Sequence, residues 1–123
     1  TFYSQIGTFP ERKDNRLFNS CPVFDPEGNL KGIYRKVHLF DIDIPGRITF
    51  TESKVLTAGD DPFTFDMGNG FKVGLGICYD MRFPELASGY AYKEQCNLII
   101  YPGAFNTVSG PVYWKILQQA RAV

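Results

Sequence analysis

The chain has 123 residues, of which 44% are hydrophobic and 21% are charged. This length and composition fit one compact domain or part of a larger one. Thirteen basic and thirteen acidic side chains cancel, so the charge balance does not favour nucleic acid or an anionic membrane as a partner. No apolar run approaches the roughly 20 residues that span a bilayer. We therefore expect neither nucleic acid nor a membrane as partner.

The three cysteines, Cys21, Cys78 and Cys96, are an odd number and show no CxxC spacing. This pattern argues against a disulfide framework and against a zinc ribbon, and we expect neither a metal nor a cofactor. A reducing compartment is the default, with the cytoplasm expected and the mitochondrion as the alternative. The first residue is Thr1 and not Met, so we expect a fragment of a longer protein.

The first third of the chain reads as strands joined by turns. We expect a short strand over residues 2–6, a polar loop over 10–15, and strands over 16–24 and 30–37. The sequence Asp-Pro-Glu-Gly at 25–28 has Pro and Gly where a tight turn needs them, which predicts a β-hairpin. From 41 to 61 the pattern breaks down, with a helical hint only over 51–56, and a loop this long is usually a lid or a binding loop.

The second half alternates strands and helices. Residues 71–77 alternate cleanly, so Phe71, Val73, Leu75 and Ile77 are expected on one face of a strand. A helix over 84–93, a buried strand over 98–101, a loop over 102–109 and a helix over 111–123 are expected to follow. The inner face of the last helix is expected to carry Val112, Ile116, Ala120 and Val123. This order predicts an α/β fold with hairpin-connected strands before it.

Cys78 lies at the carboxyl end of the best strand and directly before a helix start. Reactive groups gather at such strand ends in open α/β sheets, and a helix N-terminus favours a thiolate. Gly74 and Gly76 share its face, so we expect nothing bulky there to block a substrate. The alternative is a buried packing thiol, as free cysteines usually are, and the two readings are equally weighted. Cys21 and Cys96 lack this setting and are interpreted as packing residues.

A thiol nucleophile needs a base and a group that stabilises an oxyanion. His38 is the one histidine, but it has no evident orienting partner. Lys36 lies two residues earlier, on the same face of a strand, and its ammonium could favour a thiolate and hold an oxyanion. Taken alone, a Lys in a Tyr-Arg-Lys run is usually a solvated strand end. The residues themselves leave this choice open.

Five separated motifs resemble the nitrilase superfamily, and within it the omega-amidase branch. They are YRKVHLFDIDIPG (34–46), FTES (50–53), GLGICYDMRFPELA (74–87), YPGAFN (101–106) and SGPVYWKILQQARAV (109–123). The resemblance covers nearly the whole chain with the motifs in the same order. It implies a four-layer α-β-β-α sandwich of which only the middle part is present, so residues 1–123 would be a partial carbon-nitrogen hydrolase domain without its N-terminal and C-terminal portions.

The resemblance also implies a Glu-Lys-Cys triad with a second, supporting Glu. Carried over, Cys78 is the nucleophile, Lys36 the catalytic lysine and Glu52 the supporting glutamate, while the Tyr79 backbone N–H helps to hold the oxyanion. The general-base Glu of the family would precede Thr1, and neither Glu11 nor Glu27 lies in the matching motif. The fragment alone is therefore expected to be nearly inactive, and the full-length form is expected to be a homodimer.

For the substrate, Arg82 could grip a carboxylate bidentately, with an ion pair to Glu85 or Asp80 as the structural alternative. The resemblance favours the carboxylate role, with Phe105 lining the pocket. It implies small amide substrates, the monoamides of short dicarboxylates such as 2-oxoglutaramate. The alternatives are a deaminated-glutathione amidase of the same superfamily, a non-catalytic fragment or pseudoenzyme that only binds or assembles, and, more distantly, a cysteine hydrolase that uses His38.

Overall fold

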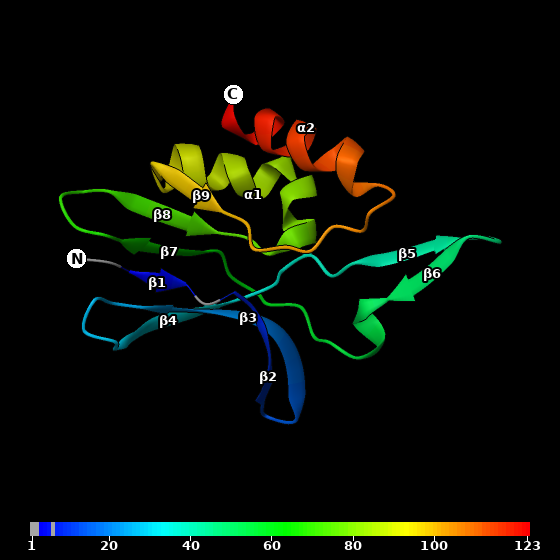
Figure 1. Cartoon of the computed structure of the whole chain (residues 1–123). Helices are drawn as coiled ribbons and strands as arrows, with labels where there is room; N and C mark the ends of the chain where they lie inside the picture. The colour runs from blue at the N-terminus through cyan, green and yellow to red at the C-terminus, as the bar shows by residue number, and fades with distance from the viewer. Residues whose placement is uncertain (1–2, 6) are drawn as a thin grey trace. The chain divides into compact units, whose positions relative to one another are not determined.

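The computed structural model describes residues 3–5 and 7–123, which form two compact units. The described residues up to Phe63 make up the first unit, and those from Thr64 onward make up the second. The first unit is built from strands, and the second combines a sheet with helices (Figure 1). The α/β class is therefore confirmed.

The main sheet of the first unit has β3 (Arg16–Phe24) at its centre. One edge of β3 pairs with β1 (Ser4–Gln5) and then β2 (Phe9–Lys13), and the other edge pairs with β4 (Leu30–Arg35). The expected hairpin between β3 and β4 is confirmed. The expected first strand is confirmed over β1, whereas residues 2 and 6 lie outside the described residues.

The polar loop predicted over residues 10–15 is wrong, because Phe9–Lys13 forms strand β2. Asp14 and Asn15 both adopt positive φ, 49° and 59°, and two such residues in a row make the turn that matches the twist of a two-residue hairpin. Asp and Asn tolerate this conformation better than most residues. The Asp-Asn pair was the signal that would have predicted the hairpin.

The stretch from 41 to 61 also contains a hairpin and is not one irregular loop. Strand β5 (Asp41–Ile44) pairs with β6 (Ile48–Thr51), and a short 3-10 helix η1 (Glu52–Lys54) follows. The turn uses Gly46 at φ 73° and a bond from the Arg47 N–H to the Ile44 carbonyl. The strands are only four residues long and largely exposed, so they lack the buried periodicity by which strands are recognised in a sequence.

The sheet of the second unit has the order β7 (Phe63–Asp66), β8 (Lys72–Leu75) and β9 (Leu98–Ile100). Strands β8 and β9 are parallel, so the chain must cross over between them, and it does so through helical segments. Strand β7 was not predicted. The expected strand over 71–77 and the alternation of strands and helices are confirmed.

The crossover consists of three helical segments in succession. A 3-10 helix η2 (Cys78–Arg82) leads into α1 (Pro84–Ser88), which continues as the π-helix η3 (Gly89–Lys93). The last element is α2 (Gly110–Ala122), and α1 and α2 lie over the same face of the sheet (Figure 1). Both predicted helices are therefore present, although the first is divided among different helix types.

The glycine face of β8 is not open, which corrects the expectation drawn from Gly74 and Gly76. A Cβ at Gly74 would lie 2.7 Å from the Tyr90 ring, and one at Gly76 would overlap the Tyr101 ring. Tyr90 is fully buried and its hydroxyl donates to the Leu75 carbonyl at 2.5 Å. Both glycines thus admit aromatic rings that anchor the helices and β9 to β8, and they leave no room for a substrate.

The burial expected for the last strand and helix is wrong. Leu98 in β9 is 43% exposed, Val112 and Ile116 in α2 are 63% and 58% exposed, and Val123, which follows α2, is 104% exposed. Helix α2 instead turns Gly110, Leu117 and Arg121 inward, and the Arg121 Nε donates to the Met81 carbonyl at 2.9 Å. The spacing of apolar residues identified the apolar face of α2, but this spacing does not say which segment packs against that face.

A clamp on β4 joins Glu11 to Arg35. The Arg35 Nε and a terminal guanidinium nitrogen donate to the two Glu11 carboxylate oxygens at 2.7 and 2.5 Å. The buried Ser20 hydroxyl donates to the same carboxylate at 2.7 Å. The Arg35 bond, reinforced by that of Ser20, holds the pKa of Glu11 below its ordinary value although burial opposes this. The clamp ties β2 to β4 across β3.

Substituting Gly76→Ala should destabilise the complete protein by about 3 kcal/mol, because the new methyl group overlaps the Tyr101 ring and the sheet cannot yield. Urea unfolding measures the loss. Gly89→Ala is the matched control, since nothing lies within 4 Å of its Cβ position. A Tyr101→Leu change should relieve part of the cost, and full additivity of the two changes would contradict the steric explanation.

Glu11→Gln should lower the urea midpoint of the complete protein at pH 7, because it removes a charged clamp on Arg35. The pKa of Glu11 in the folded protein lies below its ordinary value of 4.5. The carboxylate therefore stabilises the fold fully at pH values above 4.5, and this stabilisation is lost as the pH falls through the pKa of the folded state. The gap between wild type and variant should therefore close in acid. The exposed Glu27→Gln serves as control, and a gap that does not change with pH would refute the linkage.

Candidate active site

Cys78 begins the turn that follows β8, as its position in the sequence predicted. It is the first residue of η2 and is partly exposed. Its backbone φ is +47°, in the left-handed region that costs a residue other than Gly, Asn or Asp roughly 1–3 kcal/mol. The glycine that sharp strand-to-helix turns often carry after a nucleophile is absent here, since Tyr79 and Asp80 follow Cys78.

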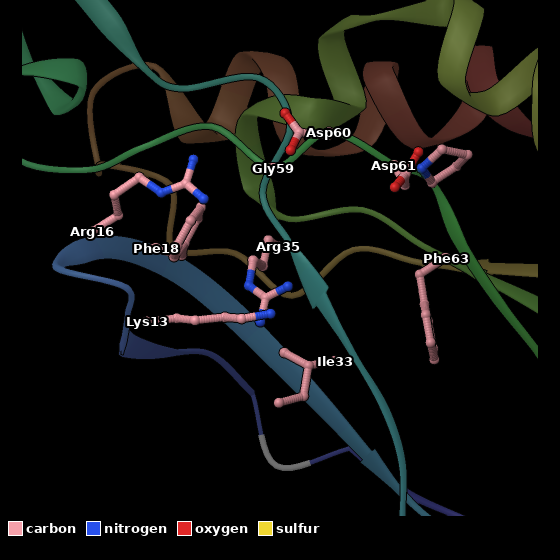
Figure 2. A pocket seen from close by; sticks show the side chains of 10 residues that line it. Lys13, Arg16, Phe18, Ile33, Arg35, Gly59, Asp60, Asp61 and Phe63 are labelled. Atoms are coloured by element: carbon pink, nitrogen blue, oxygen red, sulfur yellow. The ribbon is translucent and has the colours of Figure 1, made fainter.

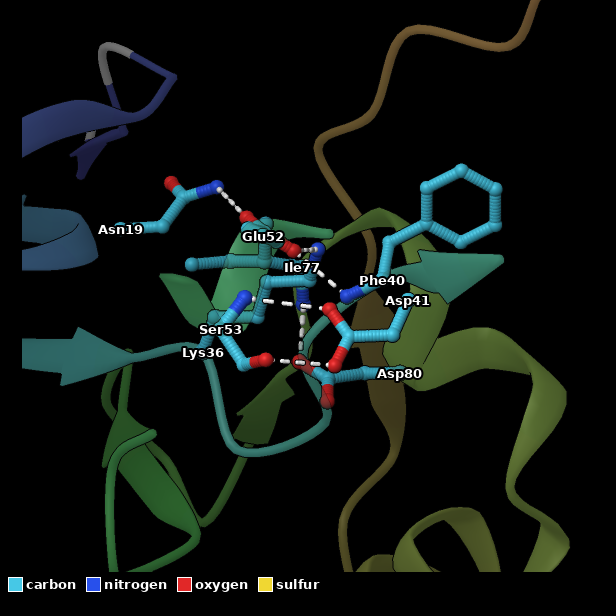
Figure 3. A network of polar contacts seen from close by, with 8 residues as sticks. All are labelled: Asn19, Lys36, Phe40, Asp41, Glu52, Ser53, Ile77 and Asp80. Carbon is cyan, nitrogen blue, oxygen red and sulfur yellow. Dashed lines mark hydrogen bonds and ion pairs between the residues drawn. The ribbon is translucent and has the colours of Figure 1, made fainter. Parts of the chain in front are cut away.

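Several contacts within the second unit hold this conformation. The Cys78 N–H donates to the Pro102 carbonyl at 2.8 Å, which extends the pairing of β8 and β9 past their ends. Gly103 then comes so near that a Cβ there would lie 3.1 Å from the Cys78 Cα and Cβ and 3.3 Å from its Sγ. On the other side, the carboxylate of the buried Asp80 accepts the Ile77 N–H at 2.7 Å (Figure 3).

Lys36 and Glu52 meet in the first unit. The Lys36 Nζ lies 2.6 Å from a Glu52 carboxylate oxygen, and the two side chains are only 4% and 9% exposed (Figure 3). Lys36 is therefore no solvated strand end. Strand β4 stops at Arg35, so the strand alternation that would place Lys36 and His38 on one face does not reach them.

A set of backbone bonds fixes this ion pair. The Phe40 N–H donates to the Glu52 carboxylate at 2.6 Å, and the Asn19 side-chain amide reaches it at 3.4 Å. The Lys36 N–H donates to the Asn19 carbonyl, and the Lys36 carbonyl accepts the Gly59 N–H, both at 2.8 Å. A buried charge that is paired and hydrogen-bonded in this way cannot leave without a large penalty. The pair is thus a rigid, charged feature of the first unit.

Arg82 stacks on aromatic rings. Its guanidinium carbon lies 4.4 Å from the centre of the Tyr113 ring and 5.7 Å from that of Tyr79. Within the part of the chain that the structure describes, Arg82 does not form the ion pair with Glu85 or Asp80 that was the structural alternative. A guanidinium that rests on a ring keeps its N–H donors in its own plane, where they can meet other acceptors.

Phe105 lies in the loop after β9, and its ring meets the Trp114 ring edge-on at 5.1 Å. This contact fastens the loop to α2, as does the bond from the Gly110 N–H to the Asn106 carbonyl at 2.8 Å. Tyr79 packs edge-on against Phe83 at 5.5 Å. The residues expected at the site thus fall into two groups, Lys36 with Glu52 in the first unit and Cys78, Tyr79, Arg82 and Phe105 in the second.

Three residues at these places were not predicted, namely Asp80, Asn19 and Gly103 as a close neighbour of Cys78. Asp80 could have been found, because an Asp three residues after the end of the predicted strand favours a side-chain bond to nearby backbone N–H groups. The other two act through chain segments far away in the sequence, so local patterns could not have revealed them.

A cavity of about 240 Å³ in the first unit is lined by none of the predicted site residues (Figure 2). Arg16 and Arg35 lie over the Phe18 ring at its edge, 5.4 and 5.1 Å from the ring centre. Asp60 and Asp61 bring charges of the opposite sign to the same lining. This mixture favours neither an anion nor a cation.

The described part of the chain offers neither a metal site nor a membrane-spanning helix. Residues 3–5 and 7–123 contain no group of three or more His, Cys, Asp or Glu side chains that could hold a metal ion. Within the same residues, no helix is both long and apolar enough to cross a membrane. Of the other two cysteines, Cys21 is buried as expected, and burial raises the pKa of the partly exposed Cys96 thiol.

Comparison with curated proteins finds relatives across nearly the whole chain. Omega-amidase NIT2 of Homo sapiens is 56% identical over 117 residues, which cover 95% of this chain and 42% of the relative. The chloroplastic omega-amidase of Arabidopsis thaliana is 56% identical over 116 residues, which cover 94% and 31%. The chain thus spans well under half the length of these relatives.

Solved structures and a family pattern agree with this result. Nit3 of Saccharomyces cerevisiae, described as a member of branch 10 of the nitrilase superfamily, matches with a TM-score of 0.81 and 43% identity over 95% of this chain and 40% of its own. The C. elegans NitFhit protein matches with a TM-score of 0.82 and 32% identity over 98% and 30%. The fold is therefore part of a nitrilase-superfamily fold. Since the carbon-nitrogen hydrolase pattern matches residues 4–123, the chain belongs to the carbon-nitrogen hydrolase family.

Proposed function

We propose that the complete protein is a thiol-dependent amidase that hydrolyses the terminal amide of short dicarboxylate monoamides such as 2-oxoglutaramate. The observation that carries this proposal is the strained turn at Cys78, φ +47°, in a chain 56% identical to proteins named omega-amidase. Backbone strain of this kind gathers at functional sites because surrounding contacts must maintain it. A packing thiol would need no such conformation.

In the first half of the proposed reaction, the Cys78 thiol gives its proton to a general base and its sulfur bonds to the amide carbon. The carbonyl oxygen becomes an oxyanion, held by the Lys36 ammonium and the Tyr79 backbone N–H. Tyr79 follows Cys78 in the first turn of η2, where helix N–H groups point outward from the helix. The carbon–nitrogen bond then breaks, the base returns the proton to the leaving nitrogen, and ammonia departs from a thioester.

In the second half, water loses a proton to the same base and attacks the thioester, which releases the acid and restores the Cys78 thiol. Glu11 is a poor base, because Arg35 and Ser20 bind its carboxylate and its pKa is lowered. We assign the base to another glutamate of the complete protein, and the 123 residues alone should then be nearly inactive. Glu52 keeps Lys36 paired and in place at 2.6 Å.

Arg82 is the proposed reader of the substrate carboxylate. Its guanidinium rests on the Tyr113 ring, and its described contacts include no carboxylate. A stacked guanidinium offers a planar pair of donors that matches a carboxylate. Phe105, fastened to Trp114, would line the same pocket. The omega-amidase names of the relatives support a short dicarboxylate monoamide as the substrate over deaminated glutathione. Faster turnover of deaminated glutathione than of 2-oxoglutaramate would reverse this substrate assignment.

The proposed assembly is a homodimer.

Cys78→Ala should lower kcat for 2-oxoglutaramate at least about 1,000-fold, because the nucleophile is lost. Lys36→Met should lower kcat about 100-fold or more through loss of a charge at the oxyanion. Ammonia release measures both rates, and circular dichroism confirms folding. Lys72→Met is the matched control, since Lys72 forms a partly exposed ion pair with Glu94 at 2.8 Å. His38→Ala should stay active; the reverse pattern, with Lys36→Met active and His38→Ala inactive, would overturn the assignment.

Arg82→Ala should raise KM for 2-oxoglutaramate about tenfold or more, because a charged hydrogen-bond partner of the carboxylate is lost. The same variant should turn over butyramide, which has no carboxylate, as the wild type does. Steady-state kinetics on the two amides measures the difference. Arg121→Ala, which removes a bond to the Met81 carbonyl, controls for loosening of η2. An unchanged KM for 2-oxoglutaramate in Arg82→Ala would end the carboxylate role.

A further inference from the structure

Cys78 needs outside support to keep its backbone conformation. The described residues other than glycine with positive φ are Asp14, Asn15, Asn69, Cys78 and Gln95. Asp and Asn side chains can stabilise this conformation by local hydrogen bonds, whereas a thiol is too weak a partner to do so. The direction of the Cys78 thiol therefore depends on what grips the backbone on both sides of it.

Strand β9 grips only one side. The Gly76 N–H donates to the Ile100 carbonyl at 3.0 Å, and the Cys78 N–H donates to the Pro102 carbonyl at 2.8 Å. Successive N–H groups of a strand point to opposite edges, so the Ile77 N–H between them points away from β9. Ile77 is 2% exposed, and a buried N–H at this place requires an acceptor.

Asp80 supplies that acceptor and closes the turn from both ends. Its carboxylate accepts the Ile77 N–H at 2.7 Å, and its own N–H donates to the Ile77 carbonyl at 3.0 Å. Its carbonyl in turn accepts the Phe83 N–H at 3.1 Å, at the start of α1. Cys78 and Tyr79 are thus enclosed between two residues that bind each other reciprocally, and Asp80 is wholly buried.

We propose that Asp80 is a positioning residue for the Cys78 nucleophile, acting as the hydrogen-bond acceptor that holds Ile77 and so fixes the turn that aims the thiol. The proposal rests on the proposed role of Cys78. The Ile77 N–H contacts one oxygen of the Asp80 carboxylate at 2.7 Å, so we assign the contribution of Asp80 to where that oxygen lies. An oxygen in the same place without the charge should serve as well.

Three substitutions in the complete protein separate place from charge. Asp80→Asn keeps an oxygen at the same distance and should retain kcat for 2-oxoglutaramate within roughly threefold. Asp80→Glu keeps the charge but moves the oxygen by one methylene, and Asp80→Ala removes the acceptor. Both should lower kcat about 100-fold, the effect of misplacing a reacting group by about 1 Å, with KM changed less than about threefold because Asp80 does not meet the substrate.

The rate at which iodoacetamide alkylates Cys78, followed by mass spectrometry, gives a second readout that needs no substrate. Alkylation should slow in Asp80→Glu and remain near the wild-type rate in Asp80→Asn. Asp66→Ala is the matched control, since the Asp66 carboxylate accepts the Gly68 N–H at 2.5 Å in the turn after β7, and it should leave both readouts unchanged. If wild type hydrolyses no amide, the proposed function fails while the alkylation comparison still tests Asp80.

Two outcomes would overturn the role of Asp80. In the first, Asp80→Asn loses as much kcat and alkylation as Asp80→Glu, which would show that an oxygen in the same place is not what holds the turn. In the second, Asp80→Glu and Asp80→Ala, folded by circular dichroism, stay within roughly threefold of wild type in both readouts. Should Asp80→Ala not fold, the comparison of the Asn and Glu variants decides the question alone.

Discussion

The second unit depends on the turn at Cys78, where the chain leaves a parallel strand and enters the crossover with a backbone conformation that its side chain does not favour. Strand β8 delivers the chain to this point, β9 and Pro102 hold one edge of it, and Asp80 holds the other. The rings of Tyr90 and Tyr101 fill the space above Gly74 and Gly76, so the strand cannot slide. The strain at one residue is therefore maintained by packing throughout the unit.

Two buried polar groups near the turn have a hydrogen-bond partner within the same unit, since the Ile77 N–H donates to the Asp80 carboxylate and the Tyr90 hydroxyl donates to the Leu75 carbonyl. The Tyr101 hydroxyl differs, because it is buried without a partner among the described residues and burial raises its pKa to about 12. Such a group stays protonated at neutral pH and can serve packing only. The position of its ring over Gly76 is consistent with this packing role.

In the first unit, ion pairs hold the charges of Arg35 and Lys36. Arg35 of the Glu11–Arg35 clamp and Lys36 of the Lys36–Glu52 pair are successive residues, and each is held by its own carboxylate. A buried pair adds little net stability, but breaking it is costly. Such pairs fix where a charge lies more than they strengthen the fold. This suits a lysine whose proposed task is to meet an oxyanion at a defined place.

The strands and helices that local chemistry dictates were predictable. The β3–β4 hairpin followed from Asp-Pro-Glu-Gly, the strand before Cys78 from its alternation, and the first helix from Pro84 and Glu85. The hairpins at Asp14-Asn15 and at Gly46 were missed because strands β2, β5 and β6 are short and largely exposed. Lys36 and Cys78 were recognisable as candidates, and the family motifs supplied the choice between Lys36 and His38.

By itself, the amino-acid sequence determined the α/β order, the family and the candidate nucleophile, because these depend on neighbours along the chain and on ordered motifs. Tertiary structure alone decided that Gly74 and Gly76 receive tyrosine rings, that the apolar stripe of α2 is exposed, and that Lys36 is buried against Glu52. It also decided that Cys78 is strained and that Asp80 holds the turn. Each of these depends on which distant segment fills a given space, and close packing settles that only once the whole chain has folded.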